Sequence, residues 1–291
     1  MFLKDLINAK DAVNRAWRES NEFVEYTDEQ LREKQLEILD VFKDLQKACV
    51  DNDILVSLCE GSALGAVRHG GFIPWDDDLD VTIPRRDFEK FKTIFNDVMG
   101  DKYILNSPNF SVDPISRFAK ILRKSDGFDG VSGTDIFVDI FILDNIPDSS
   151  KIRKVKAAWC NGLMFIAACV KQYEIKGVNV PALYRQSKAY KVRSIIGRIF
   201  SIFSGTTWYN WVDKAVQTRH ETEYCGIATA RKHYNGEYFK KDIVFPFKKT
   251  VFEGVECFVY NDVHTYLNCL YGADYMTPPP IEKREKHYHK K

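Results

Sequence analysis

The stretch GSALGAVRHGGFIPWDDDLDVTIP, residues 61–84, places four aspartates within five positions, between a glycine-rich lead and an apolar tail. They are Asp76, Asp77, Asp78 and Asp80. At an effective dielectric constant of about 20, two carboxylates about 4 Å apart repel each other by ~4 kcal/mol. A positive partner or full exposure to water must therefore relieve the repulsion within this group.

The apolar residues after the aspartates indicate a short strand, in which alternate side chains share a face. If the extended geometry begins at Trp75, then Asp76, Asp78 and Asp80 face one way and Asp77 faces the other. Hard divalent cations such as Mg²⁺ bind carboxylate oxygens. A cation between Asp78 and Asp80 would turn their repulsion into attraction, so the sequence predicts a site for Mg²⁺ (or Mn²⁺).

A third acidic side chain, Asp139, interrupts a second apolar run at residues 135–143 (DIFVDIFIL). An ionised carboxylate is costly to bury there without a partner. We expect this strand to lie beside the one that follows the aspartates, so that Asp139 completes a group of three carboxylates. The alternative is that Asp139 forms a salt bridge with Arg68 or Lys120.

The surrounding sequence predicts an α/β core with a mixed sheet over residues 27–148. Thr27 and Gln30 form a capping-box pattern, and apolar residues at helical spacing follow, which predicts a helix over 27–50. The other expected elements are strands at 54–59, 79–83, 103–106, 117–123 and 135–143, a short helical turn after Ser62, and a helix over 85–98.

The second half of the chain differs in composition. Residues 151–225 are basic and are expected to be mostly helical, and residues 226–291 are expected to contain a hairpin at 243–260 and a helix at 261–271. No internal repeat or low-complexity linker separates these parts. We therefore expect residues 1–291 to form a single domain, in which the basic helical part is an insertion and the C-terminal part completes the site.

Charge is distributed unevenly along the chain. Residues 151–200 contain eleven Lys or Arg side chains and one acidic side chain, Glu174, whereas the remaining residues carry 31 basic and 40 acidic side chains. Such a block is typical of contact with a polyanion or an anionic membrane surface, or of a solvated helical face. It lacks a recognised nucleic-acid-binding module, so nucleic acid is not an expected partner.

Apolar runs and cysteines in the sequence indicate the cellular compartment and whether zinc is bound. No apolar run reaches the ~18 residues of a membrane span, and the first residues lack the apolar core of a signal peptide. The seven cysteines are scattered without a Cys-x-x-Cys pair, which is typical of reduced core residues in the cytoplasm. A zinc site from Cys257, His264 and Cys269 is an alternative, although the spacing matches no common pattern.

The order of Gly61-Ser62, a short helix, an Asp-x-Asp strand and a later acid resembles the nucleotidyltransferase fold. More specifically, residues 61–69 (GSALGAVRH) and 71–80 (GFIPWDDDLD) resemble the signature of the LicD family of phosphotransferases, which are similar to the fukutin-type ribitol-phosphate transferases. Ser62 and Ala63 stand where the family often has Thr and Leu, which keeps a hydroxyl in place.

The resemblance extends nearly along the whole chain. Residues 138–144 (VDIFILD) resemble a later element of the family, with Ile in place of its usual Pro. Residues 252–254 (FEG), residues 271–279 (YGADYMTPP) and His287 resemble its C-terminal elements. Only the basic part, residues 151–225, lacks a motif of the family.

The resemblance implies transfer of a phospho-alcohol from a CDP-activated donor to a hydroxyl of a cell-surface glycan, with release of CMP. The phospho-alcohol would be phosphocholine, ribitol phosphate or glycerol phosphate, and the acceptor a lipopolysaccharide, teichoic acid or capsule. Asp78 and Asp80 are expected to bind the cation. Asp139 is expected to bind a second cation or to accept the proton of the acceptor hydroxyl.

The resemblance also indicates which residues surround the donor. Its phosphates are expected to meet Gly61, Ser62, Arg68 and Lys120. His69 and His287 are candidates for proton transfer or for structural hydrogen bonds, and Asp76 and Asp77 for supporting the site or capping the strand.

Acceptors in the LicD family include lipid-linked glycans. We therefore expect residues 151–200 to hold the protein peripherally at the inner face of a membrane. Two other functions stay open: transfer of a nucleoside monophosphate to a small acceptor, and glycan binding without catalysis.

Overall fold

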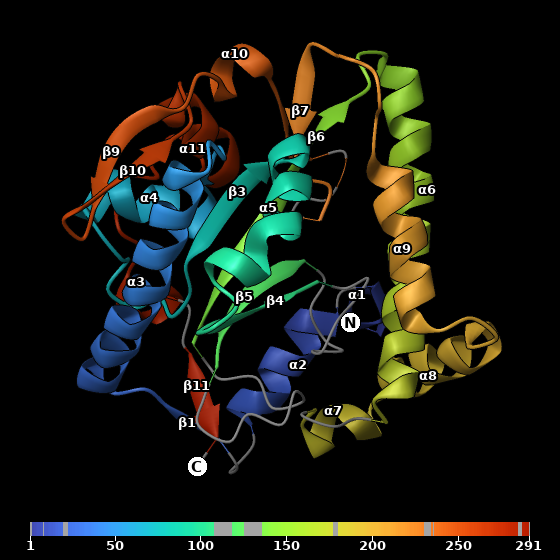
Figure 1. The fold of residues 1–291 in the computed structure, drawn as a ribbon. Coiled ribbons are helices and arrows are strands. Elements are labelled where there is room, and N and C mark those ends of the chain that lie inside the picture. The colour runs from blue at the N-terminus through green and yellow to red at the C-terminus, as the bar shows by residue number, and fades with distance from the viewer. Residues whose placement is uncertain are drawn as a thin grey trace.

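The computed structural model describes residues 2–7, 9–19, 23–107, 118–124, 136–176, 180–229, 234, 236–284 and 287–290. Its centre is a seven-stranded mixed sheet flanked by helices, as the sequence predicts (Figure 1). The strand order is β2-β3-β6-β5-β4, with β7 joined to β6 and β8 to β7; β3 and β6 are parallel, and the other pairs are antiparallel. The strands are β2 (Ser57–Leu58), β3 (Asp80–Pro84), β4 (Tyr103–Asn106), β5 (Ala119–Arg123), β6 (Phe137–Ile146), β7 (Tyr224–Gly226) and β8 (Tyr238–Lys240).

Helices of the first half pack on this sheet. They are α3 (Asp28–Asp51), α4 (Glu60–His69) and α5 (Arg85–Val98). The capping box at the start of α3 is confirmed, because Thr27 Oγ1 accepts a hydrogen bond from Gln30 N and the Gln30 side chain accepts one from Thr27 N. Helix α4 ends at Gly70, whose φ of 69° lies in the left-handed region that glycine adopts without strain.

Two of the predicted elements differ in length. The strand predicted over 54–59 is reduced to Ser57 and Leu58, because β3 offers pairing partners only to these two residues. The short turn predicted after Ser62 is a complete ten-residue helix, α4. Residues 117 and 135 of the strands predicted at 117–123 and 135–143 lie outside the described residues, whereas residues 119–123 form β5 and residues 137–143 form the start of β6.

A helical segment stands beside the sheet and contains α6 (Ser150–Glu174), α7 (Ala182–Gln186), α8 (Lys188–Phe200) and α9 (Gly205–Val216) (Figure 1). Helices α6 and α9 enclose a second hydrophobic cluster, which includes Cys160, Ala167 and Trp208 and is separate from the main core under the sheet. Within the described residues, no helix has both the length and the apolar sequence that crossing a bilayer requires.

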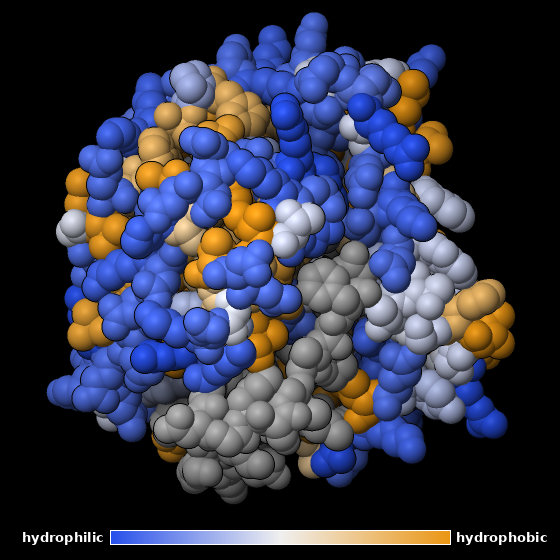
Figure 2. Space-filling view, viewed as in Figure 1, coloured by the Kyte–Doolittle hydropathy of each residue, from blue (hydrophilic) through white to orange (hydrophobic). Residues whose placement is uncertain are grey.

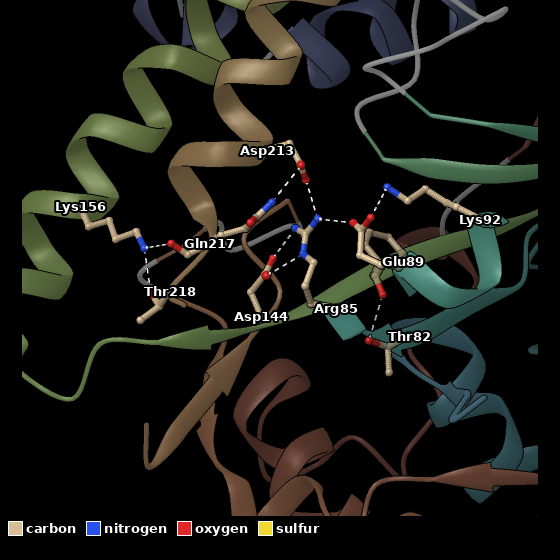
Figure 3. Close-up of polar contacts among 10 residues, drawn as sticks. Thr82, Arg85, Glu89, Lys92, Asp144, Lys156, Asp213, Gln217 and Thr218 are labelled. Atoms are coloured by element: carbon tan, nitrogen blue, oxygen red, sulfur yellow. Dashed lines mark hydrogen bonds and ion pairs between the residues drawn. The ribbon is translucent and has the colours of Figure 1, made fainter. Parts of the chain in front are cut away.

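Arg85 joins the sheet to this helical segment (Figure 3). As the first residue of α5, it donates hydrogen bonds at 2.8 and 2.7 Å to the two carboxylate oxygens of Asp144 in β6. A third bond, of 2.6 Å, reaches Asp213 in α9. Asp144 is buried, so the guanidinium provides the opposite charge that a buried carboxylate needs.

The C-terminal part packs against α3 and α4. It contains α10 (Lys241–Val244), the hairpin of β9 (Lys248–Phe252) and β10 (Val255–Val259), α11 (Val263–Tyr271) and a 3₁₀ turn (Ile281–Lys283). The hairpin and the last helix agree with the predictions. The chain ends are tied together by β1 (Phe23–Glu25), which pairs with β11 (Tyr288–Lys290), and two further helices, α1 (Phe2–Ile7) and α2 (Ala9–Arg18), precede β1.

Candidate functional site

Three carboxylates meet where β3 and β6 lie side by side. Asp80 in β3 and Asp139 in β6 are register partners across this parallel pair, as expected. Asp78 precedes β3, and one carboxylate oxygen from each of the three residues lies within 4.8 Å of the other two. Asp80 and Asp139 are buried, whereas Asp78 is half-buried at the accessible side of the group.

The concentration of negative charge affects Asp80 most. Its burial, and then the charges of Asp78 and Asp139, raise the pKa of Asp80 well above its usual range. A cation close to the three carboxylates would therefore stabilise the ionised form of Asp80.

Lys120 is the register partner of Asp139 on the other side, in β5, and its Nζ lies 2.8 Å from Asp139 Oδ1. The same ammonium group lies 3.6 Å from the centre of the Phe137 ring. The salt bridge considered for Asp139 therefore exists together with the three-carboxylate group. Lys120 is at the site, although its contact in this structure is with an acid.

Helix α4 fixes the position of the acidic strand. Ser62 Oγ accepts a hydrogen bond of 2.8 Å from Asp80 N, and Cys59 N donates to Asp80 O. Gly61 leaves room for the acids, because a Cβ there would lie 3.0 Å from Asp76 Oδ2 and 3.9 Å from Asp80 Oδ2. Gly61 and Ser62 thus shape the carboxylate group directly.

The residues before β3 do not form the extended strand expected from Trp75. A hydrogen bond from Asp76 N to Ile73 O closes a turn, and β3 begins only at Asp80. The predicted alternation of side chains is therefore wrong for Asp76 and Asp77. It fails because the turn rotates the chain before the strand begins.

Asp76 and Asp77 form a second group with His287. The Nδ1 atom of His287 lies 2.5 Å from Asp77 Oδ1, and its Nε2 atom lies 3.6 Å from Asp76 Oδ1. Lys34 of α3 holds the other oxygen of Asp77 at 2.7 Å, and the neighbouring Gln35 donates to the carbonyl oxygen of Asp76 at 2.9 Å.

The charges in this second group are matched. Burial opposes ionisation of Asp77, but the hydrogen bond from His287 and the charge of Lys34 hold the pKa of Asp77 well below its usual range. Burial likewise opposes protonation of His287, yet Asp77 raises the pKa of His287 to about 9. The imidazolium–carboxylate pair thus fastens the C-terminal tail to the loop that carries the acids.

Arg68 and His69 lie beside Trp75, the residue before the aspartates. Arg68 donates to Tyr275 O at 2.8 Å and to His69 Nε2 at 2.9 Å, and its Cζ is 5.9 Å from the Trp75 ring centre. Arg284 stacks closer, with its Cζ 4.1 Å from the same ring. Burial, and then Arg68 and Arg284, lower the pKa of His69.

These cations are available to an anion. No ion pair joins Arg68 or Arg284 to a carboxylate within the part of the chain that the structure describes. Such a pair of guanidinium groups beside an aromatic ring can bind a phosphate or carboxylate ligand.

Several residues at this site were not predicted from the sequence. Lys34 and Gln35 are polar residues at buried positions of α3, which is a signal that helical periodicity could have provided. Glu60, before Gly61, is buried with a φ of 43°, and its backbone N–H bonds to the Tyr266 hydroxyl. Arg284 lies in a charged tail that carries no periodic pattern.

The donor atoms of the three-carboxylate group fit a hard divalent cation. They are oxygens from two neighbouring strands, and Mg²⁺ or Mn²⁺ prefers such ligands. Two groups of side chains have the geometry for a metal within the described residues, and neither contains a cysteine. The zinc alternative at Cys257, His264 and Cys269 therefore receives no support.

Comparison with known proteins gives this site a context. Residues 53–151 match the LicD/FKTN/FKRP nucleotidyltransferase domain. Over 273 residues the chain is 26% identical to the protein of Haemophilus influenzae (strain ATCC 51907 / DSM 11121 / KW20 / Rd) named lipopolysaccharide cholinephosphotransferase LicD, a match that covers 89% of this chain and 96% of that protein. A shorter match, 38% over 72 residues, is to an uncharacterized protein of Rickettsia prowazekii and covers 23% of this chain and 27% of that one. Residues 53–151, which contain all three carboxylates, thus resemble the LicD/FKTN/FKRP nucleotidyltransferase domain.

Proposed function

We propose that this protein is a metal-dependent phosphotransferase that moves a phospho-alcohol from a CDP-activated donor to a hydroxyl group of a cell-surface glycan and releases CMP. The observation that carries the proposal is the meeting of Asp78, Asp80 and Asp139 within the family's nucleotidyltransferase domain. The name of the Haemophilus relative makes phosphocholine the first candidate for the transferred group and lipopolysaccharide the first candidate acceptor. Ribitol phosphate and glycerol phosphate are the other candidates.

The acids have separate tasks in this proposal. Asp78 and Asp80 would hold Mg²⁺ or Mn²⁺, and Asp139 would be either a further ligand or the base of the reaction. When bound, such a cation supplies charge neutralisation at the donor's diphosphate and at the departing CMP. As the base, Asp139 would take the proton of the acceptor hydroxyl while the hydroxyl oxygen bonds to phosphorus and the bond between phosphorus and CMP breaks.

Basic side chains orient the donor. Lys120, which contacts Asp139, would donate to a donor phosphate once a cation shares the charge of Asp139. Arg68 and Arg284 offer guanidinium groups beside the Trp75 ring. The Ser62 hydroxyl already binds Asp80 N, so we assign it to holding β3 in place, with Gly61 making room for the acids.

A panel of CDP-choline, CDP-ribitol and CDP-glycerol, incubated with purified protein and Mg²⁺ and scored for CMP, tests this function. One donor should release CMP in preference to the others, and Asp78→Asn should abolish the release. Asp97→Asn, which changes an exposed aspartate of α5, is the matched control. Release of phosphocholine in place of CMP would instead indicate transfer of the nucleoside monophosphate, and no product from any donor would contradict the proposal.

A further inference from the structure

The eleven basic side chains of residues 151–200 fall into two sets in the structure. Four have structural partners: Arg153 donates to Pro147 O, Lys156 to Gln217 O, Lys171 to Thr206 Oγ1, and Arg193 to Gln172 and to Leu6 O. The other seven are exposed, and none forms an ion pair with a described residue: Lys151, Lys154, Lys176, Arg185, Lys188, Lys191 and Arg198. These charges have no role in the packing of the segment.

Helix α8 combines such charges with exposed apolar side chains. Its inner face packs tightly on α6, since a Cβ at Gly197 would lie 2.1 Å from Cys169 O. Exposed basic and apolar side chains follow one another at helical spacing on its outer face. They are Lys188, Lys191, Ile195, Arg198, Ile199 and, just beyond the helix, Ile202. The isoleucines are 60%, 63% and 79% exposed, which is unusual for residues of this type.

Helix α6 continues this surface. Ile152, Val155 and Trp159 follow one another at spacings of three and four residues, and each is more than half exposed. Lys151 and Lys154 lie next to them in the sequence and are also exposed. Figure 2 shows hydrophobic residues among hydrophilic ones along the edge of the molecule where Figure 1 places α6 and α8.

We propose that this outer face of α6 and α8 binds the surface of an anionic lipid bilayer. Helices that lie in a membrane interface combine Lys and Arg with Trp and branched apolar residues, as this face does. Each Lys or Arg near an anionic bilayer gains electrostatic attraction, and the isoleucines and Trp159 gain burial in the headgroup region. A second copy of the chain fits the face less well, because a two-fold contact would place the two sets of unpaired positive charges against each other.

Vesicle flotation with the full-length protein tests this proposal independently of any catalysis. Wild type should float with vesicles of phosphatidylcholine and phosphatidylglycerol and remain unbound with pure phosphatidylcholine. The triple variant Lys188→Glu, Lys191→Glu, Arg198→Glu and the double variant Ile195→Asp, Ile199→Asp should each lower the bound-to-free ratio at least tenfold. All five side chains are exposed, so both variants should keep the fold, and circular dichroism checks this.

The matched controls change exposed residues elsewhere. Arg86→Glu, Lys240→Glu and Lys248→Glu together give the same change in net charge as the charge-reversal variant, and Val50→Asp places an acid at a 59% exposed apolar position of α3. Both controls should float like wild type. The proposal is overturned if wild type does not bind anionic vesicles, or if the controls lose binding as much as the two variants do. It is also overturned if sedimentation velocity shows a dimer that the Ile195→Asp, Ile199→Asp variant dissociates while the vesicle binding of this variant equals that of wild type.

Discussion

Asp80, Asp139 and Lys120 are neighbours across three adjacent strands, so the acidic group of this protein has an internal cation on one side. The ammonium group of Lys120 lies 2.8 Å from Asp139, and the Lys120 side chain is 14% exposed. Removing one partner of a buried ion pair is costly, because the charge that remains is poorly solvated.

We therefore expect Lys120→Met to lower the free energy of unfolding by about 3 kcal/mol in the absence of divalent cations. Saturating Mg²⁺ should restore part of this loss, because a cation among the carboxylates would take over the role of the ammonium group. Urea denaturation with and without Mg²⁺ measures both effects. Lys124→Met, at an exposed position just after β5, is the control, and a Lys120→Met protein as stable as wild type would contradict the assignment.

At the scale of single residues, the sequence predicted which acids meet. An Asp-x-Asp pair at the start of one apolar run and one aspartate within a second run were enough to predict this meeting, because the two runs form neighbouring strands. The partners of Asp77 could not be predicted in the same way. Lys34 and His287 come from positions 43 residues before and 210 residues after it, and only the tertiary fold brings them together.

Among the elements, the hairpin of β9 and β10 contacts Gly70 and Phe72, which lie between α4 and the aspartates. Its tip, Glu253 and Gly254, has φ values of 51° and 77°. The Glu253 carboxylate accepts hydrogen bonds from both terminal nitrogens of Arg32 in α3 and from Phe72 N, and Glu253 N donates to Gly70 O. Helix, hairpin and loop are thus joined at one side chain.

The hydrogen bond from Arg32 is the main reason that the pKa of Glu253 lies below its usual 4.5. A carboxylate with a lowered folded-state pKa contributes stability that is present above the unfolded-state pKa and is lost as the pH falls through the folded-state value. Glu253→Gln should therefore cost about 1 kcal/mol at neutral pH, because Glu253 is partly exposed and solvent screens the pair.

The difference between wild type and Glu253→Gln should shrink as the pH falls below 4.5. Thermal unfolding at a series of pH values measures it. Glu256→Gln, at an exposed position of the same hairpin, should show a much smaller difference throughout. A difference for Glu253→Gln that persists unchanged into acid would show that the carboxylate charge is not what holds the loop.

The sequence predicted the presence and type of the helices and strands better than the residues at which they begin and end. The capping box and the apolar periodicity of α3 gave its position nearly to the residue, because both signals are local. The strand before Gly61 was predicted too long and α4 too short, because the length of a strand depends on its partners. Ile54 and Val56 are buried, as strand residues would be, but β3 does not extend to pair with them.

For the whole molecule, the main question is how the helical segment is joined to the sheet. Its separate hydrophobic cluster agrees with the division into a core at 27–148, an insertion at 151–225 and a C-terminal part at 226–291, which stays a prediction. The Arg85 network crosses this division, because one guanidinium group binds both β6 and α9.

Arg85→Met should lower the free energy of unfolding by about 3 kcal/mol, because buried Asp144 loses its main cation. Backbone amides of α9 should also exchange with deuterium faster than in wild type, since one link between α9 and the sheet is gone. Arg86→Met, one residue later and exposed, is the control and should change neither quantity. Unchanged exchange in α9 would show that the apolar cluster alone holds the segment.

The dependence of CMP release on Mg²⁺ concentration, compared among wild type, Asp80→Asn and Asp97→Asn, tests most directly whether the three carboxylates form the working metal site. Wild type and Asp97→Asn should be inactive in EDTA and reach the same maximal rate as Mg²⁺ is added. Asp80→Asn should stay slower by roughly 100-fold or more at every concentration, because several kcal/mol of charge stabilisation is lost. CMP release that persists in EDTA, or an Asp80→Asn protein with the wild-type response to Mg²⁺, would contradict the assignment of the site.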